Sequence, residues 1–320
     1  MRLDIKLYRG YVNDQELVVF GHVFDSWAPD KYEIDRRGYR HAKSVYKMFT
    51  ISPIKNAKIT LKLRDMEVVT KTMDDGYFRF TVPFNQFLES GWHKYSVACQ
   101  VNGKGIVEQG ELLKPFKSQL GIISDIDDTF LISHTANFFK KLYVILTKNL
   151  DNRKVFDDVV PHYQALSRAG QEEGKFNSFF YVSSSEWNLY EFILQFARMH
   201  NLPKAIIKLK SIKTGLADFL FTGRGGHDHK FIKIKDIISF YPQLEYVLLG
   251  DDSQQDPHLY ERIVKMFPKN IKAVYIRQTR KHQKKKTRAV LENLEDLGVA
   301  TCYFKDSDKA IAHSEKIGIV

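Results

Sequence analysis

Three carboxylates follow one short apolar stretch near the middle of the sequence. Residues 121–124, Gly-Ile-Ile-Ser, have the composition of a buried strand, and Asp125, Asp127 and Asp128 come soon after. Along an extended chain Asp125 and Asp127 share a side, whereas Asp128 faces away. Two neighbouring carboxylates repel each other unless a cation or a proton intervenes. The pair suits a metal-dependent site with a nucleophile and a proton donor, although a carboxylate-rich turn or helix cap gives the same pattern.

Two other apolar runs also end in polar residues. The run 178–182 leads into three serines at 183–185, and the run 245–249 leads into Gly-Asp-Asp-Ser-Gln-Gln-Asp at 250–256. In a parallel sheet, ligands bind at the edge where the carboxyl ends of the strands meet. We therefore expect the three polar clusters to converge on one crevice.

The residues in these clusters are those that a phosphate-handling site requires. Asp125, Asp251 and Asp256 could bind Mg²⁺ with Asp127 alongside, since Mg²⁺ takes one or two carboxylates together with waters and a substrate phosphate. A hydroxyl from Ser183 and a nearby cation would complete a phosphate cradle. The alternative is three unrelated polar turns.

The cation of this cradle has two candidates in one expected helix. Lys230 stands at the helix start and Lys233 one turn later, and a solvated lysine is the alternative for either. Ser184 and Arg224, the latter in a glycine-rich loop, are candidates for further contacts to substrate. For Asp252 the plain alternative to a place in the site is a solvent-facing turn carboxylate.

The first part of the chain must supply a scaffold of strands. Runs rich in branched and aromatic residues alternate with turn signals such as Asn102-Gly103, as in a β-sandwich. The expected strands are 18–24, 58–63, 77–82 and 94–99, and residues 33–52 read as a long connection or short helix. We assign residues 1–114 to an N-terminal β-rich, sandwich-like domain, with a linker at 111–118.

The second part, residues 115–320, alternates short apolar strands with amphipathic helices. This rhythm predicts an α/β domain whose parallel, Rossmann-like sheet is covered on both faces. Its expected strands are 178–182, 245–249, 272–276 and 299–304, and its expected helices 187–200, 257–266 and 287–297, with a further helix at the end.

The ordered motifs of this second domain resemble a known superfamily. Asp-x-Asp-x-Thr at 125–129, a strand ending in Ser183, then Lys230 and Gly-Asp-x-x-x-x-Asp at 250–256 are similar to the four motifs of the haloacid dehalogenase superfamily. The stretches 181–190, 250–257 and 275–277, with His229 and Tyr260, resemble a narrower group within it. That group is the catalytic-domain family of the actin-patch-associated phosphatidate phosphatase, and the resemblance covers about 120–304.

The resemblance implies roles for the central residues. Asp125 would be the nucleophile that becomes an aspartyl-phosphate, and Asp127 would protonate the leaving oxygen and then deprotonate water. Ser183 and Lys230 would hold the transferring oxygens. The implied cofactor is Mg²⁺, and the implied reaction is hydrolysis of phosphatidate to diacylglycerol.

The resemblance also implies a metal shell and contains departures. Asp125, Asp251 and the carbonyl of Asp127 would hold the metal, with Asp256 supporting it. Where the family pattern has Ser-Gly, this chain has Asp252-Ser253, and Glu186 replaces an expected proline. These changes flank the phosphate site, so they bear on the substrate rather than on the chemistry.

The net charge of the chain favours anionic partners but does not distinguish among them. The chain has 320 residues, a net charge of +11 and a pI of about 9.3, which favours anionic partners. Basic stretches at 134–149 and 277–288 could meet an anionic membrane, although an ordinary packed helix and a solvated loop are the plainer readings. Cys99 and Cys302 are expected as buried thiols. We expect a cytoplasmic protein that can also lie peripherally on a membrane, and nucleic acid is a less favoured partner.

Three functions remain open from the sequence. The first is a Mg²⁺-dependent phosphatase of a lipid phosphomonoester, and the second is the same chemistry on a soluble or nucleic-acid-terminal phosphate. The third is a catalytically silent module that binds acidic membrane or nucleic acid. The presence of every acid of the motifs favours an enzyme. Oligomeric state and the role of the β-rich domain are left undetermined.

Overall fold

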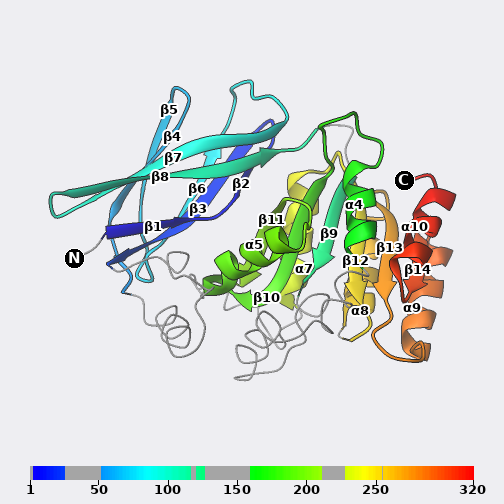
Figure 1. The fold of residues 1–320 in the computed structure, drawn as a ribbon. Helices are drawn as coiled ribbons and strands as arrows, with labels where there is room; N and C mark the ends of the chain where they lie inside the picture. The colour runs from blue at the N-terminus through cyan, green and yellow to red at the C-terminus, as the bar shows by residue number, and fades with distance from the viewer. Residues whose placement is uncertain (1–2, 26–51, 117–119, 127–158, 211–227, 254) are drawn as a thin grey trace. The chain divides into compact units, whose positions relative to one another are not determined.

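The computed structural model describes residues 3–25, 52–116, 120–126, 159–210, 228–253 and 255–320 (Figure 1). They form two compact units. The first takes its described residues from Met1–Pro115 and Glu186–Gln195, and the second from Phe116–Ser185, Phe196–Lys210 and Phe219–Val320. The expected connection at 33–52 lies almost wholly outside the described residues, and the basic stretch at 134–149 lies entirely outside them.

The first unit contains a predominantly antiparallel sheet of eight strands. These are β1 (Leu3–Leu7), β2 (Gly10–Val12), β3 (Glu16–Asp25), β4 (Lys58–Leu63), β5 (Met66–Lys71), β6 (Tyr77–Pro83), β7 (Gly91–Val101) and β8 (Lys104–Lys114). The order is β1-β3-β2-β8-β7-β4-β5, with β6 paired to β3. The predicted strands are present, but hydrogen bonding joins them into one sheet rather than the two separate sheets of a sandwich. The reason is that β3 pairs with β1 and β2 as well as with β6.

Turn chemistry and burial explain this sheet locally. Asn102 and Gly103 both have positive φ, 50° and 76°, as the two-residue hairpin turn between β7 and β8 requires. Alternate residues of β4, including Ile59 and Leu61, are fully buried in the core of this unit. Strand β8 continues to Lys114, so the first four residues of the expected linker are strand.

The second unit contains a six-stranded sheet, which confirms the predicted α/β class and parallel arrangement. Its strands are β9 (Leu120–Asp125), β10 (Ser178–Glu186), β11 (Ala205–Lys210), β12 (Glu245–Asp251), β13 (Ile271–Arg277) and β14 (Ala300–Phe304). The order is β11-β10-β9-β12-β13-β14, and the pairs from β10 to β14 are parallel. Nearly every residue of β9, β12 and β13 is buried, as expected for a parallel sheet covered on both faces.

Helices alternate with these strands along the chain (Figure 1). They are α4 (Val160–Arg168), the short 3₁₀ helix η3 (Trp187–Leu189) with α5 (Tyr190–Met199), α7 (Asp228–Phe240), α8 (Asp256–Met266), α9 (Lys285–Asp296) and α10 (Ser307–Lys316). Helices α7, α8 and α9 contact one another in series, while α4 contacts α10. No helix among the described residues is long and apolar enough to cross a membrane.

One packed cluster beneath α4 and α10 contains a buried histidine. His162 of α4 is fully buried, its Nε2 lies 3.0 Å from Ser314 Oγ of α10, and its ring lies 4.7 Å from that of Tyr275 on β13. Its Nδ1 has no hydrogen-bond partner among the described residues. Burial, reinforced by the charge of His313, lowers the pKa of His162 to about 3.

We predict that this histidine makes the protein sensitive to acid. In the unfolded chain its pKa returns to about 6.5, so the unfolded state binds the extra proton first. The contribution of neutral His162 is complete above pH 6.5 and is lost as the pH falls toward 3, with a slope of up to about 1.4 kcal/mol per pH unit. Urea unfolding followed by circular dichroism should show a shallower acid loss in His162→Gln than in the wild type. Equal slopes would contradict the assignment.

Candidate active site

The parallel register brings the predicted clusters to one edge of the sheet. Asp125 ends β9 and pairs in register with Val182 of β10, so Ser183 is the next residue along β10. On the other side of β9, Leu249 pairs with Ser124, and β12 ends two residues later at Asp251. The carboxyl ends of β9, β10 and β12 therefore meet, as predicted.

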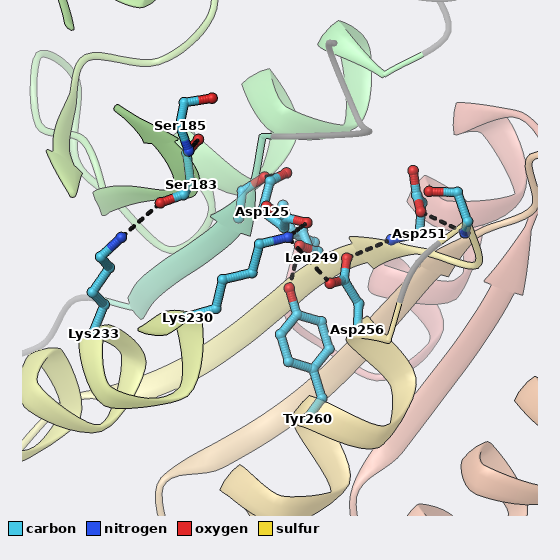
Figure 2. Close-up of polar contacts among 11 residues, drawn as sticks. Asp125, Ser183, Ser185, Lys230, Lys233, Leu249, Asp251, Asp256 and Tyr260 are labelled. Carbon is cyan, nitrogen blue, oxygen red and sulfur yellow. Dashed lines mark hydrogen bonds and ion pairs between the residues drawn. The ribbon is translucent and has the colours of Figure 1, made fainter. Parts of the chain in front are cut away.

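A buried ion pair lies at the centre of this edge. Lys230 Nζ of α7 is 2.6 Å from Asp125 Oδ2 and 3.8 Å from Asp256 Oδ1. The three side chains are only 2–3% exposed. Figure 2 shows Lys230 directed at the two carboxylates. In such a dry position a lysine stabilises ionised carboxylates more strongly than it would at the surface.

The second lysine candidate points elsewhere. Lys233 Nζ donates to the main-chain oxygen of Ser183 at 2.7 Å, as Figure 2 shows. The geometry therefore pairs Lys230 with Asp125, while Lys233 supports the end of β10. Ser183 is fully buried, and its hydroxyl accepts the N–H of Ser185 at 2.9 Å. Strand β10 continues to Glu186, so both serines lie within the strand.

Asp251 and Asp256 are held to each other by the turn after β12. Asp256 Oδ2 accepts the N–H of Asp251 at 3.2 Å, and Asp251 Oδ1 accepts the N–H of Ser253 at 2.7 Å (Figure 2). Gly250 makes this possible, because a Cβ there would lie 2.7 Å from Asp256 Oδ2 and 2.9 Å from the ring of Tyr260. The glycine of the Gly-Asp motif is thus required by close packing rather than by backbone conformation.

Two buried tyrosines pack beneath the carboxyl ends of β9 and β12. Tyr260 donates to the Leu249 carbonyl at 2.7 Å, and burial, with the charges of Asp256 and Asp125, raises its pKa well above 10. Tyr163 lies 2.7 Å from Ser124 Oγ, and burial raises its pKa too. Both phenols stay neutral at physiological pH. They keep the surroundings of Asp125 poor in water.

The charges at this edge fit a divalent cation. Asp125, Asp251, Asp252 and Asp256 are buried there with Lys230 and Arg277, which leaves an excess of two negative charges when all four acids are ionised. The donors are oxygens, the ligands that Mg²⁺ prefers. No three His, Cys, Asp or Glu side chains among the described residues are gathered closely enough to form a metal cage. Mg²⁺ needs fewer, since it usually retains waters and binds through one or two carboxylates.

Several predicted residues lie outside this picture. Asp127, Thr129 and Arg224 are not among the described residues. Ser184 is partly buried, one residue beyond Ser183 on β10. The solvent-facing alternative for Asp252 is wrong: the side chain is 1% exposed.

The burial of Asp252 reveals partners that the local pattern did not indicate. Its Oδ2 accepts the hydroxyl of Tyr303 on β14 at 2.5 Å, and its Oδ1 accepts the N–H of Thr279 at 3.0 Å. Both partners lie more than 25 residues away, so only the strand order brings them together. The hydrophilic sequence around Asp252 contained no signal for them.

Comparison with known proteins agrees with this geometry. Residues 120–278 match the family model described as phosphatidate phosphatase APP1, catalytic domain. This part of the chain belongs to that family. The match begins at the first residue of β9 and ends one residue beyond β13, so it includes all of the clustered side chains. The expected family is thereby confirmed.

The APP1 family includes a curated yeast relative. Phosphatidate phosphatase APP1 of Saccharomyces cerevisiae is 28% identical over 164 residues, which cover 49% of this chain and 26% of the yeast protein. This chain thus matches about a quarter of the length of that relative.

Solved structures provide weaker comparisons. A carbohydrate acetylesterase from Xanthomonas citri aligns with 98% of this chain and 75% of its own at 8% identity, with a TM-score of 0.35. A putative α-galactosidase from Bacteroides fragilis aligns with 98% and 55% at 8% identity, with a TM-score of 0.26. Scores this low carry no argument about fold or function.

The two lysines should differ sharply in their effect on stability. Lys230→Met would leave buried carboxylates uncompensated and should lower the free energy of unfolding in chelator by about 3 kcal/mol or more. Lys233→Met removes the donor to the neutral Ser183 carbonyl and leaves the Lys230–Asp125 pair in place, so its cost should be smaller, about 1 kcal/mol. Urea unfolding of both variants at neutral pH tests this. Equal losses would show that the Lys230–Asp125 pair has no special role in stability.

Proposed function

We propose that this protein is a Mg²⁺-dependent phosphatase that hydrolyses a phosphomonoester through an aspartyl-phosphate, and that its substrate is phosphatidate. The observation that carries the proposal is the buried pair of Asp125 and Lys230 at the carboxyl edge of a parallel sheet. Membership of residues 120–278 in the APP1 catalytic-domain family supports the lipid substrate. The order of motifs along the sheet supports a fold of the haloacid dehalogenase type.

In the first step, a carboxylate oxygen of Asp125 attacks phosphorus. The bond from phosphorus to the glycerol oxygen breaks, and Asp127 donates a proton to the departing oxygen, which releases diacylglycerol. Lys230 and Ser183 hold the phosphoryl oxygens as their charge shifts in the transition state. The carboxylates of Asp125 and Asp256 hold the ammonium of Lys230 at the site.

In the second step, water attacks the phosphorus of the acyl phosphate. Asp127 accepts a proton from that water, and the bond between phosphorus and the Asp125 oxygen breaks to release inorganic phosphate. Asp125 returns as a carboxylate beside Lys230, so the ion pair is the resting state of the cycle. Because the site is dry, fixed charges act there with little screening.

A bound Mg²⁺ would offset the repulsion between the anionic Asp125 and the anionic phosphate. Asp125, Asp251 and the main-chain carbonyl of Asp127 are the proposed ligands, with Asp256 supporting them from just outside or through water. The excess of buried negative charge at this edge supports that assignment. Ser184 and Arg224 are the proposed further contacts to the substrate phosphate.

We expect Asp125→Asn to abolish release of phosphate from phosphatidate in detergent mixed micelles. The loss should be about a thousandfold or more, because the nucleophile itself is removed. Chelation should abolish the wild-type activity, and added Mg²⁺ should restore it. The matched control is Asp296→Asn, which makes the same chemical change at the exposed end of α9 and should retain activity.

A second substrate separates the chemistry from the lipid. Metal-dependent turnover of a small aryl phosphate without release from phosphatidate would keep the phosphatase and replace the substrate with a soluble one. Full activity of Asp125→Asn would overturn the mechanism. No turnover of either substrate by the wild type would favour a module that only binds.

A further inference from the structure

A strongly basic segment, residues 277–288, follows β13 and leads into α9. It contains seven arginines and lysines in twelve residues and no acidic residue. Arg280, Lys281, Lys285 and Lys286 are exposed. A charge run of this kind is often only a solvated loop. A role in binding requires that the segment be held in a fixed position by the rest of the fold.

Asp252 holds this segment in place. The buried carboxylate accepts the N–H of Thr279 at 3.0 Å and also the Thr279 hydroxyl, while its main-chain oxygen accepts the ammonium of Lys284. The hydroxyl of Tyr303, which donates to Asp252 at 2.5 Å, also accepts the N–H of Lys284 at 3.0 Å. Gln278 N–H donates to the Phe304 carbonyl at 2.6 Å. The two ends of the loop before α9 are therefore both anchored.

The anchored segment lies at the edge that contains the site. Arg277, its first residue, pairs in register with Asp251, and Asp252 directly follows Asp251 along the chain. Asp252 thus fixes the basic segment beside the acids.

The cations of the segment do not stabilise α9, the helix at whose amino end they lie. Lys285, Lys286 and Arg288 lie in the first turn of α9, and Lys284 is its N-cap without a side-chain cap hydrogen bond. The amino end of a helix carries positive partial charge, so cations there reduce its stability and repel one another. The first turn contains no acidic residue. An external anion would relieve this unfavourable arrangement.

We infer that the basic segment is a docking element for an anionic membrane surface, which turns the acidic edge of the sheet toward lipid. The choice of partner rests on the proposed lipid substrate. Residues 279–286, Thr-Arg-Lys-His-Gln-Lys-Lys-Lys, include no apolar side chain to insert into a bilayer and no Phe, Tyr or Trp to stack on nucleic-acid bases. The docking is therefore electrostatic and depends on salt.

The test is co-sedimentation of the whole chain with phosphatidylcholine vesicles, with and without phosphatidylserine, in chelator. Phosphatidylserine carries no phosphomonoester, so its binding does not depend on the proposed catalysis. A variant with Arg280, Lys281, Lys285 and Lys286 changed to Gln should bind the anionic vesicles at least about tenfold more weakly and up to roughly 600-fold if all four cations lie at the surface, where each contributes roughly fivefold. Wild-type binding should fall at high salt and vanish without phosphatidylserine.

The matched control removes four exposed lysines at the opposite edge of the same sheet. Lys204 precedes β11, Lys265 lies in the last turn of α8, Lys269 lies between α8 and β13, and Lys316 ends α10. Changed to Gln, they remove the same charge and should leave vesicle binding within about twofold of the wild type. Equal weakening by both variants would overturn the inference, since net charge alone would then explain binding.

Two further outcomes would also overturn it. One is a wild-type protein that does not bind anionic vesicles at low salt. The other is duplex DNA that competes the protein off the vesicles and shows the same dependence on the four cations. Vesicle binding that behaves as expected while phosphate release fails would support the docking element and contradict the proposed function separately.

Discussion

The ion pair between Asp125 and Lys230 is the constraint on which the second unit depends. Both groups lie out of water, and a buried charge without a partner is strongly destabilising. Strand β9 must therefore end where α7 can deliver a lysine, and α8 must begin with Asp256 within reach of the same ammonium. One lysine cannot balance all of the buried acids. The ion pairs of Lys230 stabilise the folded edge, and the remaining negative charge there would attract a cation.

The rest of the edge maintains this arrangement through packing. Gly250 lets Asp256 approach the end of β12, and Tyr260 seals the space beneath the acids. On the far side, Asp252 turns away from the centre and joins β12 to β14 and to the basic segment. Adjacent carboxylates thus have different partners: Asp251 accepts the N–H of Ser253 within the turn after β12, whereas Asp252 organises a neighbouring surface.

The sequence predicted the gathering of Asp125, Ser183 and Asp251 because parallel strands end at a common edge. It could not separate Lys230 from Lys233: both can lie on one side of a helix, and only the rotation of α7 decides which meets Asp125. It also missed the burial of Asp252, whose partners come from distant strands. In the first unit the strands were predictable, but the continuous sheet was not, because it depends on which strands pair with the two sides of β3.

If Asp125 carries the phosphoryl group during turnover, the phosphorylated protein can be trapped chemically. The protein would be mixed with phosphatidate labelled in its phosphate, quenched in acid during turnover, digested and mapped by mass spectrometry. We expect an alkali-labile label on the peptide that contains Asp125, and none when Asp125 is changed to Asn. A label on any other residue, or continued turnover in that variant, would contradict it.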